Sequence, residues 1–168
     1  MMMPDKRTIE RARRDKRQGK SPSTQAGEFI HDEIRKIRRG KHGARSAKQA
    51  IAIGLSEARR AGVDLPPPRK GQTKERTRRS AQYAYSAGQH KRKVLRRPKA
   101  SRSAERALKR EPRKAASHRA LSRQARTASA RRGAAARSAS ARKASHAKGH
   151  AQRSAAKKAA HTRARRRA

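Results

Sequence analysis

The sequence contains no cysteine and no tryptophan, and its aromatic residues are limited to two tyrosines and one phenylalanine. The absence of cysteine excludes disulfide bonds and thiolate metal sites. The scarcity of aromatic rings leaves almost no platform on which unpaired bases could stack, which is how sequence-specific RNA and single-strand binders usually work. Acidic residues are scarce as well, because 11 Asp and Glu stand against 51 Lys and Arg in 168 residues, giving a net charge of +40. This balance indicates a polyanionic partner.

Large apolar side chains are equally few. Leu, Ile, Val and Phe together make up about 8% of the chain, whereas strongly charged chains below roughly 20% are expected to stay disordered. We therefore predict a mostly disordered protein with a small all-α part, and no single packed core that spans the sequence. The longest segment without a charged residue runs only from Ser80 to His90, so we expect no signal peptide, no membrane span and a cytoplasmic location.

Charge divides the chain into three zones. Residues 1–68 hold 17 basic and 8 acidic residues, residues 69–111 hold 16 and 3, and residues 112–168 hold 18 and none. Nearly all bulky aliphatic residues lie between Phe29 and Leu65, so the globular part is expected there. The predicted organisation is a basic N-terminal segment (1–20), a small helical hairpin (21–65), a basic linker with short helices (66–111) and a disordered arm rich in Ala, Arg and Lys (112–168).

Two helices are predicted within residues 24–62. The first begins at a Ser or Thr cap at residues 23–24 and stops at Gly40. The second begins with a capping box, Ser46 to Gln49, and ends where Gly62 suits the left-handed C′ position before three prolines. The short linker between them indicates an antiparallel hairpin. Its large apolar residues are Phe29, Ile30, Ile34, Ile37, Ile51, Ile53, Leu55, Val63 and Leu65.

This hairpin is expected to be marginally stable by itself, because units below about 40 residues without disulfides or metals rarely fold alone. A second copy of the chain, the preceding segment or nucleic acid would complete it, so a homo-oligomer formed through the hairpin is one option. Further short helices are possible within residues 73–168. The strongest of these covers residues 74–87, with Thr73 as its N-cap and Gly88 beyond its end.

Basic residues recur every five positions in the arm, at Lys143, Lys148, Arg153, Lys158 and Arg163. In a helix each step of five advances about 140° around the axis, so no single cationic face results. A membrane-surface helix needs the opposite arrangement, with cations on one side and large apolar residues on the other. We expect an arm that is disordered when free and partly helical once phosphates screen its charge.

Forty net positive charges could neutralise roughly 70 Å of duplex DNA, about 20 base pairs, because the duplex carries one charge per about 1.7 Å of axis. Neutralisation on that scale favours condensation and bridging over recognition of a sequence. The predicted contacts to the nucleic-acid backbone are Lys41, His42, Arg45, Lys48, Arg119, Arg123, Arg126, Arg131, Arg132, Arg137, Arg142, Lys143, Lys148, Arg153, Lys157, Lys158, Arg163, Arg165, Arg166 and Arg167.

The run Gly40-Lys41-His42-Gly43 is a basic GxxG loop between the two predicted helices. It either seats a phosphate beside the N–H groups that begin the second helix or is an ordinary turn between helices. A similar loop clamps the nucleic-acid backbone in KH modules, but no flanking strands are visible here, so a KH fold is not expected.

No catalytic or metal-binding pattern is evident. His146 and His150 have the i,i+4 spacing of two metal ligands on a helix face, but no third ligand is nearby. Asp32 and Glu33 are expected to pair with Lys36 and Arg35 or their neighbours. The serines lack the sequence settings of known nucleophiles, so neither enzyme activity nor a cofactor is expected.

The segment from Ser21 to Val63 resembles an uncharacterised family of small basic bacterial proteins, defined as a domain of unknown function. The likeness rests on residues 21–29, on the loop at residues 40–46 and on residues 48–63. It implies a bacterial origin and brings no established activity. The arm is similar in composition to linker-histone-like bacterial proteins, although it carries Arg rather than mostly Lys and lacks repeated Pro-Ala-Lys units. That likeness implies chromatin-like compaction.

The leading hypothesis is a sequence-tolerant, nucleoid-associated, histone-like protein that neutralises DNA phosphates and bridges duplexes. An RNA-binding or ribosome-associated basic protein is the alternative, because charge alone does not distinguish one polyphosphate from another. A third hypothesis is an interaction adaptor whose hairpin binds a protein through Phe29, Ile34 and Leu55 while the arm only localises it.

Overall fold

The computed structural model describes residues 5–91 and 98–146, and within these ranges the chain is predominantly helical and contains no strand. The expectation of a mostly disordered protein is therefore wrong. In chain order the elements are α1 (Lys6–Arg17), α2 (Pro22–Arg38), α3 (Ala47–Arg60), α4 (Glu75–Gly88), α5 (Pro98–Arg110), the 3₁₀ turn η1 (Arg113–Ala116) and α6 (His118–Ala130), and residues 133–146 are also helical.

The core consists mostly of alanine, which explains why a count of large aliphatic residues underestimates it. Ten of the 13 buried hydrophobic residues in the described ranges are alanines. Alanine is the strongest helix former, and its methyl group lets helices approach closely. Helices that would be too poor in Leu and Ile to bury a conventional apolar face can therefore still pack.

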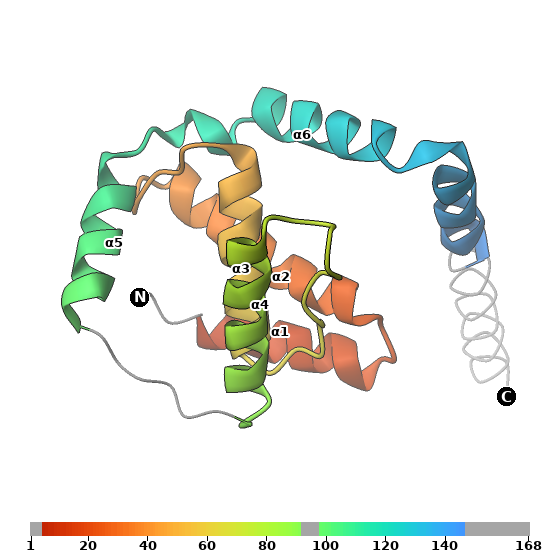
Figure 1. Ribbon diagram of the computed structural model, residues 1–168, viewed down its shortest axis with the longest axis horizontal. Coiled ribbons are helices and arrows are strands. Elements are labelled where there is room, and N and C mark those ends of the chain that lie inside the picture. The colour runs from red at the N-terminus through yellow and green to blue at the C-terminus, as the bar shows by residue number, and fades with distance from the viewer. Residues whose placement is uncertain (1–4, 92–97, 147–168) are drawn as a thin grey trace, which may run out of the picture. The chain divides into compact units, whose positions relative to one another are not determined.

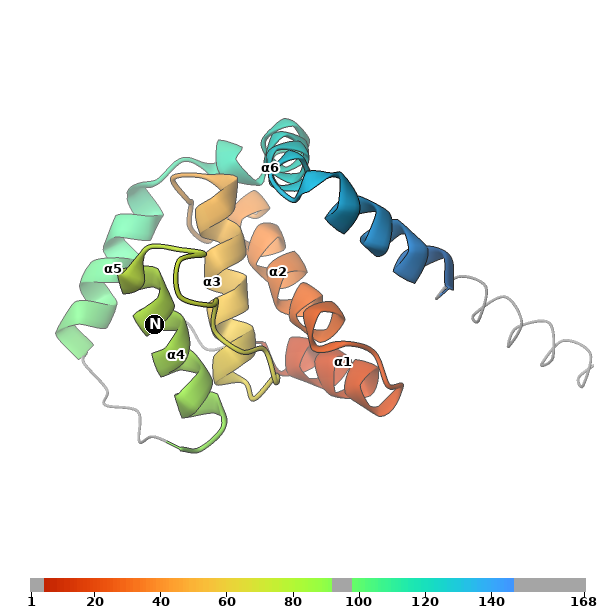
Figure 2. The same cartoon turned by 45° about the vertical axis from the view of Figure 1, so that its right-hand side comes forward.

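The chain forms two compact units, residues 1–124 and residues 125–168. In the first unit α1 packs on α2, α2 on α3 and α3 on α4, and Figures 1 and 2 both show α3 and α4 side by side. Of the second unit the structure describes residues 125–146, which comprise the end of α6 and the helix at 133–146. None of the side chains in that part is buried.

One core cluster joins α1 to the hairpin that α2 and α3 form. Phe29 of α2 is fully buried and packs with Ala12 of α1 and Ala58 of α3. Ile9 and Leu55 lie against the same cluster. The segment that precedes the hairpin therefore completes it, which is one of the options expected from the sequence. Phe29 has no exposed surface to offer a protein partner.

A second cluster fixes η1 on the same hairpin. Ala115 and Ala116 are buried against Ile37, Ala44 and Ala50. Arg38 Nε donates a hydrogen bond of 2.9 Å to the carbonyl oxygen of Ala116. The segment predicted to begin a disordered arm is thus docked where it leaves α5, because its two small alanines fit against the end of α2 and the start of α3.

The structure confirms the N-cap at Ser46 and the end at Gly62, while the Gln49 side chain accepts from the Arg45 N–H instead of the Ser46 N–H of a capping box. Ser46 Oγ accepts from the Gln49 N–H at 3.2 Å, and Gln49 Oε1 accepts from the Arg45 N–H at 2.8 Å. At the other end Gly62 has φ +88°, and the Val63 N–H donates to the Ala58 carbonyl at 3.1 Å. These bonds satisfy backbone groups that the helix leaves without partners.

Two other helix ends differ from expectation. The helix α2 begins at Pro22 after Ser21, because proline at the first helical position has its fixed φ already suited to the helix. The helix α4 is capped by Lys74 rather than Thr73, and Gly88 is its last residue instead of lying beyond it. A Cβ on Gly88 would overlap the carbonyl oxygen of Arg59, so this glycine permits close contact between α4 and α3.

Candidate nucleic-acid interface

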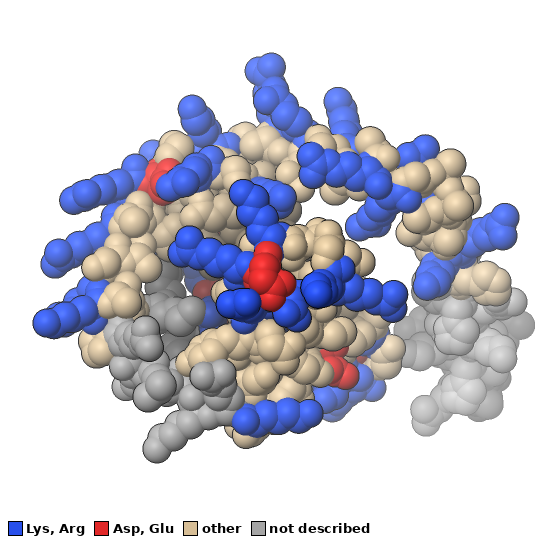
Figure 3. All heavy atoms as spheres, in the orientation of Figure 1, with Lys and Arg blue, Asp and Glu red and all other residues tan. Residues whose placement is uncertain are grey.

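Most of the acidic residues are buried or paired with cations, whereas Asp5, Glu10 and Asp64 are exposed and have no ion pair with a described residue. All 11 lie in the described ranges, and Asp15, Asp32, Glu33 and Glu57 are buried. Among the described Lys and Arg residues only Lys36 and Arg59 are buried. Figure 3 shows Lys and Arg over much of the visible face, with few acidic side chains among them. Further acids are paired with cations, in the ion pairs Arg11–Glu28, Arg78–Glu75, Lys109–Glu105 and Arg45–Glu111.

A buried ionic cluster lies between α2 and α3. Lys36 Nζ lies 2.8 Å from Asp32 Oδ2 and 3.6 Å from Glu57 Oε2. The pairing of Asp32 with Lys36 confirms the expectation for Asp32, whereas the ion pair of Glu33 is with His42. Burial acts to lower the pKa of Lys36, but its partners Asp32 and Glu57 outweigh burial and raise it. Burial raises the pKa of Glu57, against the opposing charge of Lys36.

Glu33 occupies the same interior beside the GxxG loop. Its Oε2 lies 3.5 Å from His42 Nε2, and its buried Oε1 has no hydrogen-bond partner among the described residues. Burial raises the pKa of Glu33 to about 7, with His42 opposing the shift and Glu57 adding to it. The charges of this cluster act within the protein and do not face a ligand.

The GxxG loop is covered by the chain that follows α5. The Gly43 N–H donates to the Leu108 carbonyl at 2.8 Å, and the Ala44 N–H donates to the Pro112 carbonyl at 3.2 Å. A Cβ on Gly43 would overlap the Glu111 carbonyl. These two N–H groups are therefore used inside the protein, and the turn interpretation fits them better than a phosphate clamp.

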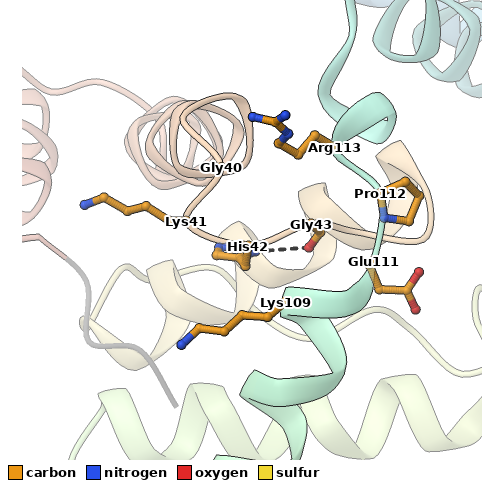
Figure 4. A pocket seen from close by; sticks show the side chains of 8 residues that line it. All are labelled: Gly40, Lys41, His42, Gly43, Lys109, Glu111, Pro112 and Arg113. Carbon is orange, nitrogen blue, oxygen red and sulfur yellow. Dashed lines mark hydrogen bonds between the residues drawn. The ribbon is translucent and has the colours of Figure 1, made fainter.

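The predicted contact residues around this loop have different surroundings. His42 is 3% exposed, so its ring does not reach the surface. Lys41, Arg45 and Lys48 are exposed. Lys41 and Lys109 line an open pocket beside the loop, and in Figure 4 both side chains extend to the same side, away from Glu111. The pocket therefore brings a cation of the loop near a cation at the end of α5.

The helix α6 carries three of the predicted contacts on one face. Arg119, Arg123 and Arg126 follow an i,i+4,i+7 spacing, and Leu121 lies on the opposite, partly shielded face. The predicted residues Arg119, Arg123, Arg126, Arg131, Arg132, Arg137, Arg142 and Lys143 are all exposed. The predicted residues Lys148, Arg153, Lys157, Lys158, Arg163, Arg165, Arg166 and Arg167 lie outside the described residues.

The predicted contacts lie in the GxxG loop, at the start of α3 and after residue 112, and they do not include a cationic face on α5. The 3,4 spacing of its basic residues, readable from the sequence, would have revealed this face. Ser101 and Leu108 are partly shielded on the other side of the helix, and Glu105 lies at the edge of the face, where it pairs with Lys109. The exposed cations of α5 are Lys99, Arg102, Arg106, Lys109 and Arg110.

The exposed side of α1 is also basic, although no part of it was predicted as a contact. Thr8, Ala12 and Asp15 are its buried residues and face the rest of the protein. Its exposed basic residues are Lys6, Arg7, Arg13, Arg14, Lys16 and Arg17.

In the described ranges, no group of three or more His, Asp or Glu residues could hold a metal ion. His146 lies within these ranges, whereas His150, its expected companion, lies outside them. None of the helices described is both long enough and apolar enough to span a membrane.

No curated protein and no solved structure shows significant similarity to the chain. One family model matches part of the chain, and the matched residues contain α1 as well as the hairpin of α2 and α3. Residues 5–70 match this model, which is described as a family of unknown function, DUF6496.

Proposed function

We propose that this protein is a sequence-tolerant DNA-binding protein that neutralises phosphates and bridges duplexes, in the manner of a nucleoid-associated, histone-like protein. The helical unit displays cations on α1, α5 and α6, and the residues that follow add further positive charge. Binding depends on the backbone of the nucleic acid and not on base edges.

The observation that carries this proposal is the separation of charge between interior and surface. Four of the 11 acids are buried, whereas only two of the described Lys and Arg residues are. Burying carboxylates is costly, and it removes negative charge from the surface that a polyanion would meet. The ratio of positive to negative side chains is therefore higher on the surface than in the whole sequence. Such a surface favours electrostatic association with phosphates.

Duplex nucleic acid suits this surface better than single strands. Single-strand binders place bases on exposed aromatic rings. Here Phe29 is fully buried, and the Tyr85 hydroxyl donates a 2.6 Å hydrogen bond to Asp64. Contacts from Lys and Arg to phosphates remain, and they carry no sequence information.

The test measures affinity of the full chain for labelled 30-base-pair DNA duplexes of unrelated sequence, by fluorescence anisotropy between 0.05 and 0.4 M salt. We expect similar affinities for all duplexes. The logarithm of the association constant should fall linearly with the logarithm of salt, with a slope of about 0.9 for each phosphate contacted. A strong preference for one sequence, or an affinity that salt leaves unchanged, would contradict the proposal.

The same titration includes duplex RNA of matching length as a competitor. Displacement of DNA by an equal or higher amount of RNA supports the DNA proposal. Displacement by a small fraction of that amount would favour the alternative of an RNA-binding or ribosome-associated protein.

A further inference from the structure

We infer that the cationic face of α5 is the main docking surface for the duplex, and that it follows one row of DNA phosphates. This inference rests on the proposed function and names the element that positions the nucleic acid. It differs from the expectation drawn from the sequence, which assigned binding to the GxxG loop and to the chain after residue 112.

The geometry of α5 gathers its cations on one side. Successive residues of a helix are about 100° apart, so Lys99, Arg102, Arg106, Lys109 and Arg110 fall within about 100° of one another around the axis. All five side chains are exposed. In Figure 3 blue side chains project outward at the left edge, where Figure 1 places α5.

The charge density of this face matches that of one DNA strand. From Lys99 to Arg110 the helix rises about 16 Å at 1.5 Å per residue. One strand of duplex DNA places a phosphate every 3.4 Å of axis, which gives about five phosphates over the same length. Five cations therefore face about five phosphates. Lys109 Nζ also lies 3.0 Å from Glu105 Oε1, so a phosphate at that position exchanges with this carboxylate, and the other four cations carry most of the contact.

The end of this face is fixed to the folded unit. Backbone hydrogen bonds hold Gly43 to Leu108 and Ala44 to Pro112, at 2.8 and 3.2 Å. Arg113 Nη1 lies 3.1 Å from the position that a Cβ on Gly40 would occupy, so its guanidinium covers the loop. Lys41 and Lys109 line the pocket there. The face thus continues from α5 onto Lys41 of the loop, on a rigid support.

The helix at 133–146 provides the contrast. Its cations Arg137, Arg142 and Lys143 are exposed, but steps of about 140° and 100° distribute them around the axis. A straight duplex can meet only one side of that helix. Removing the same number of charges from the two helices should therefore weaken binding by different amounts.

The experiment compares two triple variants that each replace one Lys and two Arg by Gln. The first is Lys99→Gln, Arg102→Gln and Arg106→Gln on α5, and the matched control is Arg137→Gln, Arg142→Gln and Lys143→Gln. Glutamine keeps helix propensity close to that of Lys and Arg, and circular dichroism checks that helix content is retained. Affinity for a 30-base-pair duplex is measured as a function of salt.

A slope of about 0.9 per contact corresponds to roughly a fivefold loss of affinity per contact at 0.15 M salt, referred to 1 M. We expect the α5 variant to lose about a hundredfold in affinity, with a slope lower by up to about 2.7. The control should lose about fivefold, with a slope lower by about 0.9.

Equal losses in the two variants would overturn the inference about α5 and leave DNA binding intact. Failure of the unmodified chain to bind DNA would instead overturn the proposed function. A further readout is hydrogen exchange of the full chain with and without duplex. Slower exchange of the α5 amides on DNA binding supports the inference, and unchanged exchange in α5 beside slower exchange in residues 133–146 contradicts it.

Discussion

Gly54 of α3 lies directly against the backbone of α2. A Cβ on Gly54 would stand 2.8 Å from the Cα of Ile30 and 3.1 Å from the Phe29 carbonyl oxygen. Backbone atoms cannot move aside as the end of a flexible side chain can. The absence of a side chain at this position therefore sets the distance between the two helices of the hairpin.

Replacing Gly54 by Ala should lower the free energy of unfolding by about 1–3 kcal/mol, because the added methyl group forces the helices apart. The matched control is Gly27→Ala in α2, where an added Cβ meets nothing within 4 Å. That substitution should stabilise the protein by up to about 1 kcal/mol through helix propensity. Urea denaturation measures both, and a neutral effect of Gly54→Ala would show that the helices can separate freely.

Glu33 should make stability depend on pH. Its pKa is raised from 4.5 to about 7 by burial, in a surrounding formed by His42, Glu57, Lys36 and Asp32. A carboxyl with a raised pKa binds its proton more tightly in the folded chain than in the unfolded one. Its favourable contribution is therefore present at low pH and is lost as the pH rises from about 4.5 through 7.

Glu33→Gln keeps the shape of the protonated carboxyl group but cannot ionise, so the variant should not lose this contribution to stability as the pH rises. We expect it to raise the free energy of unfolding at pH 8 by about 2 kcal/mol more than at pH 5. The control Glu10→Gln removes the same charge from the exposed side of α1, where water solvates the carboxylate. Denaturant titrations at both pH values decide the matter, and a pH-independent effect of Glu33→Gln would refute the argument.

Among the elements, α3 is the one that the sequence predicts most accurately. Its cap at Ser46 and its end at Gly62 depend on side chains and dihedral angles within a few residues of each terminus. The packing of η1, by contrast, depends on residues that are far apart in the sequence. Arg38 and Ala116 are 78 positions apart, and nothing near either residue indicates that they meet.

The candidate interface likewise contains residues that could be predicted from the sequence and residues that could not. The exposed cations at Lys41 and Lys48 could be predicted from composition and position. The burial of His42 could not, because it results from its contact with Glu33 and from the cover that residues 108–116 provide. The face on α5 was available in the spacing of its basic residues and was missed because the arm had more charge.

The docking of η1 can be tested with Ala116→Lys. Ala116 has no exposed surface, so a lysine there should displace the turn. We expect the Gly43 and Ala44 amides, which donate to carbonyls of residues 108 and 112, to lose their protection from hydrogen exchange. The control Ala130→Lys adds the same charge at an exposed position of α6. Retained protection in the Ala116→Lys variant would contradict the docking.

For the whole molecule, the charge beyond α6 should add affinity without adding specificity. Residues 131–168 contain 13 Lys and Arg and no acid, and their removal leaves the docked η1 in place. We expect the truncated chain to bind all duplexes more weakly by about the same factor, with an unchanged melting temperature. A chain in which residues 131–168 are shuffled should bind as the original does. A truncation that changed sequence preference alone would contradict this account.

The alanine-built core has a consequence for what happens when the chain unfolds. Unfolding exposes mainly alanine methyl groups and charged side chains, so it exposes little apolar surface that could aggregate. The high net positive charge also makes unfolded molecules repel one another. The heat-capacity change of unfolding and the sensitivity to urea should both be small for a chain of this length. A heated solution should accordingly stay clear and recover its helicity on cooling.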